Sequence, residues 1–133
     1  MIKYYKDLTI VIITYKSDEI IYKFIKKIPK KIKVIVVENS INIFLKKKLE
    51  KKFNNTKVYL RRNEGVAGSL NFGVKKSKTK YVLHLSPDLD LNYKIIKYFF
   101  KYAEILKDDF CALGPRFLKT KKRDTYRSIR VLK

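Results

Sequence analysis

Four short apolar runs, rich in β-branched residues, alternate along the chain with segments of helical periodicity. The runs cover residues 8–14, 32–37, 56–60 and 81–85. The run at residues 8–14 is uninterrupted, which indicates a strand that is covered on both faces, because a half-exposed strand alternates apolar and polar residues. The runs at 32–37 and 81–85 are also expected to be buried strands, and 56–60 a short third strand. Helices between such strands, joined by short connections, favour parallel pairing. The sequence therefore predicts an α/β fold with a Rossmann-like, mostly parallel sheet and helices on both faces.

The predicted helices place apolar residues on one stripe and Lys on the other. They cover about residues 18–28, 41–53, 66–77 and 92–107. The second of these helices is expected to turn Phe44, Leu45, Leu49 and Phe53 inward.

The end of the chain carries weaker signals. A short fifth strand of the same sheet is expected at residues 110–113, before Gly114-Pro115. Residues 1–116 are therefore expected to form the α/β domain. Residues 117–133 are basic and have no clear hydrophobic period, so they are expected to form a C-terminal tail.

The net charge of +21 reflects 33 Lys and Arg residues against 12 Asp and Glu residues. Such a charge attracts nucleic acid, anionic lipid or phosphorylated ligands. The excess is mostly Lys on predicted helix faces, so a solvated basic surface is the simplest interpretation. Contact with an anionic membrane surface stays open.

Two absences bear on the expected location. No apolar run approaches the ~20 residues that a membrane span needs, and no signal peptide precedes the first strand. The single cysteine, Cys111, excludes an internal disulfide and suits a reducing compartment. A cytoplasmic location is expected, with peripheral attachment to the inner face of the membrane left open.

Polar residues follow three of the predicted strands. Thr14 and Tyr15 end the first strand, Glu38 follows the second, and Asp88 and Asp90 follow the fourth. The carboxyl ends of parallel strands share one edge of the sheet, where ligands of α/β proteins bind. Carboxylates there are costly unless a cation meets them. Residues i and i+2 of an extended segment share a face, so Asp88 and Asp90 are placed to meet such a cation together, and a charge at the entry of the next helix is the alternative for Asp90.

Three of the four glycines, Gly65, Gly68 and Gly73, lie after the third strand. Glycines let a backbone approach a ligand closely, and the start of a helix attracts phosphate. A tight turn followed by close helix packing explains them equally well. The spacing is neither that of a P-loop nor the dinucleotide G-x-G-x-x-G pattern.

Five segments in a fixed order carry a resemblance to a known family. They are Thr14-Tyr15-Lys16, Val37-Glu38-Asn39-Ser40, the glycine segment from Asn63 to Gly73, Leu85-Ser86-Pro87-Asp88 and Leu113-Gly114-Pro115-Arg116. In spacing and order they resemble family 2 glycosyltransferases, particularly the rhamnosyltransferase-like branch.

The chain departs from the family pattern at three places. Glu38 stands where the family has Asp, and Ser86 stands where it has an acid or Asn. Asp90 lies two residues beyond the family's metal-site register.

The resemblance implies a GT-A-type fold and an inverting transfer of a sugar from a nucleoside diphosphate sugar to a carbohydrate or lipid-linked acceptor. It implies that Thr14 and Tyr15 border the base and that Glu38 holds the base or the ribose. The wall around the diphosphate and ribose would consist of Asn63, Gly68 and Asn71.

The same resemblance implies a divalent metal, Mg²⁺ or Mn²⁺, that Asp88 ligates and that bridges the diphosphate. The metal would neutralise charge on the departing diphosphate. Asp90 is the candidate for a second ligand.

The family's acceptor-binding half and general base would lie beyond residue 133. The chain is therefore expected to correspond to the N-terminal, nucleotide-sugar-binding half, with no catalytic base identified. In residues 117–133 the only carboxylate is that of Asp124. A non-catalytic nucleotide-binding or interaction module of the same fold is the alternative. A Lys-rich nucleic-acid binder is less favoured, because carboxylates at the site repel a phosphate backbone, and nucleic acid is not an expected partner.

Overall fold

The computed structural model describes residues 4–107, 109–118 and 125–132. The chain divides into two compact units, Met1–Leu91 and Asn92–Lys133. The boundary expected after residue 116 falls inside a strand, β5 (Ala112–Leu118).

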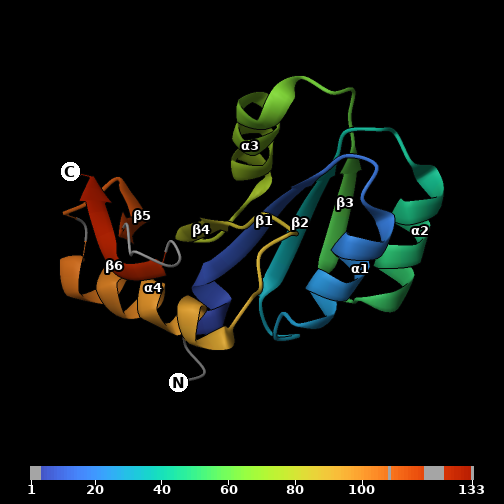
Figure 1. The fold of residues 1–133 in the computed structure, drawn as a ribbon. Coiled ribbons are helices and arrows are strands. Elements are labelled where there is room, and N and C mark those ends of the chain that lie inside the picture. The colour runs from blue at the N-terminus through green and yellow to red at the C-terminus, as the bar shows by residue number, and fades with distance from the viewer. Residues whose placement is uncertain (1–3, 108, 119–124, 133) are drawn as a thin grey trace. The chain divides into compact units, whose positions relative to one another are not determined.

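The first unit is built on a parallel sheet of four strands in the order β3-β2-β1-β4, with β1 and β2 in the middle (Figure 1). The strands are β1 (Leu8–Thr14), β2 (Lys33–Glu38), β3 (Thr56–Leu60) and β4 (Tyr81–His84). Nearly every residue of the two central strands is buried, as their uninterrupted apolar runs predict.

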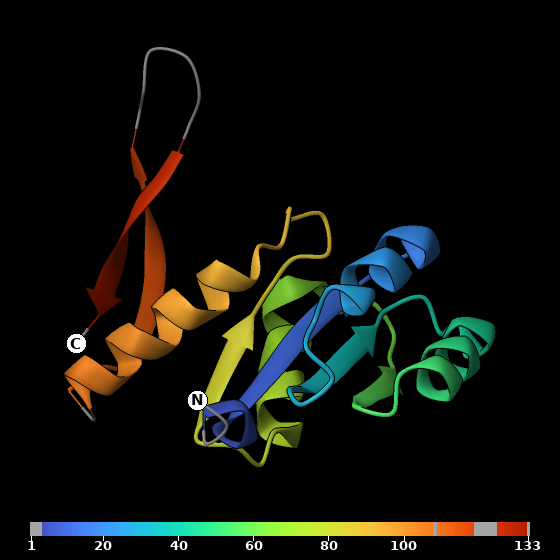
Figure 2. The ribbon, with the colours of Figure 1, turned by 90° about the horizontal axis from the view of Figure 1, so that it is seen from below.

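Helices cover both faces of this sheet, which confirms the predicted fold class. They are α1 (Asp18–Lys26), α2 (Ile43–Lys52) and α3 (Gly65–Lys76), preceded by a short 3₁₀ turn, η1 (Tyr4–Asp7). In Figures 1 and 2, α3 lies on one side of the sheet, and α1 and α2 lie on the other. Side chains alternate between the two faces along each strand, so both faces of β1 are packed.

The inward face predicted for α2 is wrong at one residue. Leu45 and Leu49, four residues apart, are buried, whereas Phe44 is 85% exposed. Successive residues are about 100° apart around a helix, so the buried stripe that Leu45 and Leu49 define leaves Phe44 outside it. Phe53 follows the helix, and its ring lies 5.3 Å from that of Tyr22.

Strand β4 lies at an edge of the sheet and is less covered than predicted. Its first three residues are half-buried and His84 is exposed. The Nδ1 atom of His84 lies 3.1 Å from the carbonyl oxygen of Val11, which accepts a hydrogen bond from it.

The opposite edge, that of β3, is partly closed by side chains of α2. The amide of Val58 donates to Oε1 of Glu50 at 2.9 Å, and Nζ of Lys46 donates to the carbonyl of Val58 at 2.7 Å. Both backbone groups of Val58 would otherwise stand open on an edge strand, where they could pair with another chain.

In the second unit, α4 (Tyr93–Leu106) is followed by β5 and β6 (Thr125–Leu132), which pair antiparallel. Asn92 caps α4 by accepting a hydrogen bond from the amide of Lys94 at 3.0 Å. The prediction of a fifth strand in the parallel sheet is therefore wrong, and residues 125–132 of the expected basic tail form β6. Asp124 lies outside the described residues.

No helix within the described part of the chain is long and apolar enough to cross a membrane.

The ion pairs of Glu50 predict a pH-dependent contribution to stability. Burial raises the pKa of Glu50, but the Val58 amide and the ammonium groups of Lys46 and Lys57 together bring it below its usual 4.5. A lowered folded-state pKa means that the ionised carboxylate stabilises the fold above about pH 4.5, and that this contribution is lost as the pH falls through the folded-state pKa.

We expect Glu50→Gln to reduce the free energy of unfolding at pH 7 by up to about 1 kcal/mol. The difference from wild type should shrink toward zero near pH 3, as measured by urea denaturation. Gln keeps an acceptor for the Val58 amide, so the variant tests the charge. Glu19→Gln, on the exposed side of α1, is the control and should leave stability unchanged at both pH values. An equal loss at pH 7 and pH 3 would contradict the assignment.

Candidate functional site

The carboxyl edge of the sheet gathers the residues predicted to bind a ligand. In the β1–β2 register, Thr14 lies opposite Glu38. On the other side of β1, the chain leaves β4 with the amide of Leu85 bonded to the carbonyl of Val11 at 3.2 Å, and then enters the segment that carries Asp88. Thr14 and Glu38 therefore lie side by side at the carboxyl edge, as the parallel topology predicts, whereas β4 ends beside Val11, three residues before the end of β1.

Glu38 is fully buried, and its carboxylate accepts three hydrogen bonds from the loop that follows it. Oε1 accepts from the amide of Ser40 at 2.9 Å and from the hydroxyl of the same residue. Oε2 accepts from the amide of Asn42 at 2.6 Å. Each carboxylate oxygen has two lone pairs, so one on Oε2 is left. The carboxylate shapes this loop, and its contact with a base or ribose stays a prediction.

The two residues predicted to border a base differ in accessibility. Thr14 is buried, and its hydroxyl has no hydrogen-bond partner within the part of the chain that the structure describes. Tyr15 is about half exposed, and the Nζ atom of Lys16 lies 5.3 Å from the centre of its ring. A flat ligand can reach the ring of Tyr15, whereas the hydroxyl of Thr14 lies below the surface.

A buried polar pair joins the end of β2 to α3. Nδ2 of Asn39 donates to Oγ of Ser69 at 2.8 Å, and Oγ of Ser69 donates to Oδ1 of Asn39 at 3.0 Å. The amide of Asn39 also donates to the carbonyl of Thr14 at 2.9 Å. Sequence reasoning missed Ser69, because a serine inside a helix carries no signal of its own. The only hint in the sequence is that Ser69 lies four residues after Gly65 and four residues before Gly73.

Two of the three glycines before and in α3 have structural roles. Gly65 adopts a φ of +78°, which side chains rarely tolerate, and its amide donates to Oδ1 of Asn63 at 3.1 Å. At Gly73 a Cβ atom would lie 2.5 Å from Cγ1 of Val11, so the glycine lets α3 approach β1. A tight turn and close packing, one of the two interpretations of the sequence, are confirmed at these positions.

Gly68 differs from the other two. A Cβ atom there would meet only the side chain of Glu64, at 3.4 Å. Asn71 lies exposed three residues later, on the same side of the helix. Room therefore remains beside the first turns of α3, and ligand binding by Gly68 and Asn71 stays a prediction.

The two acids after β4 have separate partners. The amide of Leu89 donates to the carbonyl of Ser86 at 3.2 Å and closes a turn. Asp88 accepts a hydrogen bond from the Ser86 hydroxyl, and Oδ1 of Asp90 lies 3.1 Å from Nζ of Lys27. The expectation of an extended segment with both acids on one face is wrong, because Pro87 and the turn interrupt it. Metal binding by Asp88 or Asp90 is still a prediction.

Comparison with known proteins identifies the family. The sequence profile of Glycosyl transferase family 2 matches residues 9–131. The chain belongs to glycosyl transferase family 2. No curated protein sequence matches it.

Solved structures support the fold of this family 2 chain. A crystal structure of S. aureus TarS 1-349 superposes with a TM-score of 0.65 at 19% identity. A structure of the same TarS fragment in complex with UDP gives a TM-score of 0.61 at 20% identity. Each superposition covers 92% of this chain and 38% of the TarS chain. The likeness shows the mostly parallel GT-A-type fold, and this chain spans well under half of the structures it matches.

The residues of this family 2 chain fit a metal that is shared with a ligand. Within the described ranges, no three His, Cys, Asp or Glu side chains are placed to hold a metal ion. Mg²⁺ in nucleotide enzymes is usually held by one or two carboxylates, substrate phosphates and water. Asp88, exposed and following β4, is the oxygen ligand that suits such a site.

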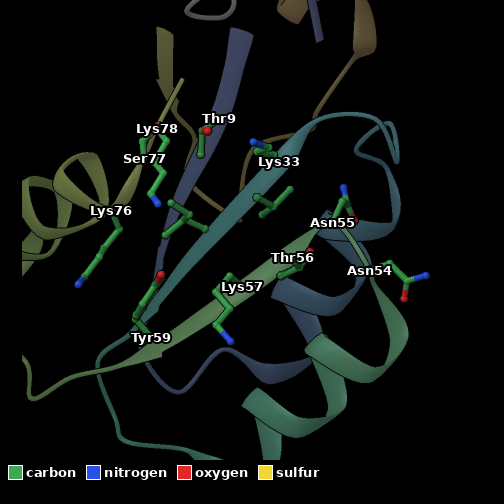
Figure 3. A pocket seen from close by; sticks show the side chains of 12 residues that line it. Thr9, Lys33, Asn54, Asn55, Thr56, Lys57, Tyr59, Lys76, Ser77 and Lys78 are labelled. Atoms are coloured by element: carbon green, nitrogen blue, oxygen red, sulfur yellow. The ribbon is translucent and has the colours of Figure 1, made fainter. Parts of the chain in front are cut away.

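A cavity of about 280 Å³ lies at the other edge of the sheet, where β1, β2 and β3 begin and α3 ends. Figure 3 shows its labelled lysines on different sides of it: Lys33, Lys57, Lys76 and Lys78. Nζ of Lys57 lies 3.5 Å from a carboxylate oxygen of Glu50, and Nζ of Lys76 lies over the rings of Tyr59 and Phe72. Since the predicted nucleotide-sugar residues lie at the carboxyl edge, this cavity is not their site.

The packing of α3 predicts opposite effects of alanine at two glycines. Gly73→Ala should lower the free energy of unfolding by about 1–3 kcal/mol, because its methyl group would overlap Val11 of a buried strand. Gly68→Ala should leave stability unchanged or raise it by up to about 1 kcal/mol, because alanine favours the helix. Urea denaturation measures both. Equal stability of the two variants would show that α3 does not approach β1 this closely.

Proposed function

We propose that the chain binds a nucleoside diphosphate sugar at the carboxyl edge of its sheet and forms the donor-binding part of a metal-assisted, inverting glycosyltransferase. The observation that carries the proposal is its membership of glycosyl transferase family 2 over residues 9–131. The pairing of Thr14 with Glu38 at that edge of a parallel sheet supports it.

The base would stack on Tyr15, with Thr14 beneath it. Tyr15 is accessible and follows directly on a buried strand, so its backbone is held in place. One TarS structure is a complex with UDP, which supports a uridine diphosphate sugar as the first donor to test. The rhamnosyltransferase-like sequence features make a thymidine diphosphate sugar the second.

The diphosphate and ribose would lie along the start of α3, near Asn63, Gly68 and Asn71. The first amides of a helix carry partial positive charge and no partner within the helix, so they suit a phosphate. Asn63 already orders this start through the amide of Gly65. Gly68 leaves room there for the ligand.

Asp88 would ligate Mg²⁺ or Mn²⁺ together with the diphosphate oxygens, and Asp90 is the weaker candidate because Lys27 pairs with it. When bound, the ion would offset the charge that develops on the departing diphosphate. Ser86 holds the Asp88 carboxylate through its hydroxyl and so fixes where that carboxylate points.

Glu38 would act mainly as a positioning residue. Its carboxylate is used by the amides of Ser40 and Asn42, so it orders the loop beside the base. One free lone pair on Oε2 leaves a single further hydrogen bond, for example from a base N–H.

The acceptor would be a carbohydrate or a lipid-linked saccharide of a polysaccharide pathway. An inverting transfer needs a base that takes the proton of the acceptor hydroxyl. No described residue is assigned that role, so the base and the acceptor site would come from outside the described residues.

Titration calorimetry with UDP-glucose and with thymidine diphosphate rhamnose tests the proposal. We expect binding with Mn²⁺ that weakens at least about tenfold with EDTA, equivalent to about 1.4 kcal/mol. Asp88→Asn should weaken binding in Mn²⁺ to the level of wild type in EDTA. Asp90→Asn should change it less than about threefold. Binding that is indifferent to metal and to Asp88→Asn would exclude the metal-assisted mechanism.

Variants of Glu38 and Asp88 should differ in their effect on thermal stability. Glu38→Ala leaves two loop amides without their acceptor, so we expect both lower nucleotide affinity and a lower Tm. Asp88→Asn should lower affinity with a Tm close to that of wild type. A Glu38→Ala variant of unchanged Tm would show that the carboxylate serves the ligand alone. Tight, salt-sensitive binding of random DNA without any nucleotide effect would instead favour a nucleic-acid binder.

A further inference from the structure

Three apolar side chains stand in solvent at the start of α2. Phe44 is 85% exposed, Ile43 is 51% exposed and Ile41 is 49% exposed. Single exposed apolar residues are ordinary, but three within four positions form a patch. These three residues are called the α2 tip below.

The backbone at Ile41 makes this exposure more unusual. Its φ is +58°, in the left-handed region. For a β-branched residue that conformation is a true outlier and strains the backbone. Gly or Asn would adopt it at lower cost. An isoleucine there destabilises the fold through its backbone and leaves an apolar side chain in water, so stability does not explain it.

Hydrogen bonds on both sides of Ile41 hold the α2 tip in place. The Glu38 carboxylate accepts from the amides of Ser40 and Asn42, which flank Ile41. Oδ1 of Asn42 caps α2 by accepting from the amide of Leu45 at 2.9 Å, and its Nδ2 donates to Asp18 at 2.9 Å. The α2 tip is therefore held in an exposed position by the buried carboxylate of Glu38 and by the side chain of Asn42.

The charge around the tip is mostly positive. The first turn of α2 has no acidic residue, and the start of a helix carries a partial positive charge. Lys47 and Lys48 are exposed three and four residues after Phe44, on the same side of the helix, and Lys51 follows one turn later. Nζ of Lys48 also lies 5.0 Å from the Tyr22 ring.

Two acids oppose this charge. Asp18 and Glu19 begin α1, and Asp18 bonds to Asn42 beside the tip. Lys46 does not add to the exposed charge, because it bonds to the carbonyl of Val58 and lies 3.6 Å from Glu50. The exposed lysines of α2 face away from the sheet and outnumber the two acids.

We propose that the α2 tip inserts into the interface of a bilayer that contains anionic lipid, with Lys47, Lys48 and Lys51 among the headgroups. A cluster of exposed apolar side chains beside lysines suits the boundary between headgroups and acyl chains. Each lysine near an anionic surface adds electrostatic attraction to the lipid headgroups. The proposal does not depend on nucleotide binding.

A membrane fits the size of the patch better than a protein does. Stable protein interfaces bury about 20–30 residues on each side, whereas the tip has three apolar side chains. Shallow insertion of a few side chains, added to electrostatic attraction, is sufficient for reversible membrane binding. Leu45 and Leu49 face the sheet, so only the tip of α2 would enter the lipid, and the helix would stay packed.

Vesicle sedimentation with the full chain tests the proposal. We expect the chain to bind vesicles of phosphatidylcholine with about 30% phosphatidylglycerol at least about tenfold more tightly than vesicles of phosphatidylcholine alone. This binding should weaken at high salt. The variant Ile43→Ser/Phe44→Ser should lower the partition coefficient at least about tenfold. Val74→Ser, which alters a 43% exposed valine on α3, is the matched control and should bind as wild type does.

Charge-reversal variants distinguish binding through the lysines beside the α2 tip from binding through the overall positive charge of the chain. Lys47→Glu/Lys48→Glu should weaken binding to anionic vesicles, whereas Lys33→Glu/Lys78→Glu, at the amino edge of the sheet, changes net charge equally and should have little effect. Equal losses from the two pairs would overturn the proposal, as would absence of binding to anionic vesicles.

A substitution at Ile41 distinguishes a role in membrane binding from a role in the stability of the fold. Ile41→Asn should raise the Tm, because Asn tolerates the left-handed backbone, and should lower vesicle binding. A fall in both would mean that the isoleucine serves the fold. Sedimentation velocity without lipid completes the test. If the wild type self-associates and the α2 tip variants do not, the tip forms contacts between copies of the chain. That result would overturn the membrane proposal.

Discussion

The buried carboxylate of Glu38 is the interaction on which the carboxyl edge of the sheet depends. A charge removed from water is costly unless hydrogen bonds replace its solvation. Here the amides of Ser40 and Asn42 and the Ser40 hydroxyl provide them, in charge-assisted bonds that are stronger than neutral ones. The same bonds set the direction in which the chain leaves β2 and the residue at which α2 begins. The hydrogen bonds of Glu38 therefore determine both the loop beside the predicted base site and the position of the α2 tip.

The large positive charge does not by itself mark a site. Lysines surround the cavity at the amino edge of the sheet, yet Lys57 is paired with Glu50 and Lys76 lies over aromatic rings. What distinguishes one basic surface from another is what accompanies it. At the start of α2 the lysines are accompanied by exposed apolar side chains. Function is therefore better inferred from combinations of groups than from net charge.

Much of the fold could be predicted from the sequence, since a strand buried on both faces leaves an unbroken apolar run, as in β1. The bounds of β3 were also predicted, although Lys57 interrupts its apolar residues. The errors occurred where local patterns do not determine structure. Phe44 was predicted to face inward because it is apolar, although helical spacing places it outside the stripe of Leu45 and Leu49. The run before Gly114 gave no indication of its antiparallel partner, and the turn at Pro87 separated two acids that sequence spacing had joined.

The change from the family's Asp to Glu38 has a consequence at this edge. One additional methylene lets the carboxylate reach the amide of Asn42, four residues on, while it still binds that of Ser40. The loop thus takes most of the hydrogen-bonding capacity that the resemblance assigns to a nucleotide, which leaves Tyr15 as the accessible group for a base. A ligand that needed more than the one remaining lone pair of Oε2 would compete with the amides that hold Ile41 in its strained conformation.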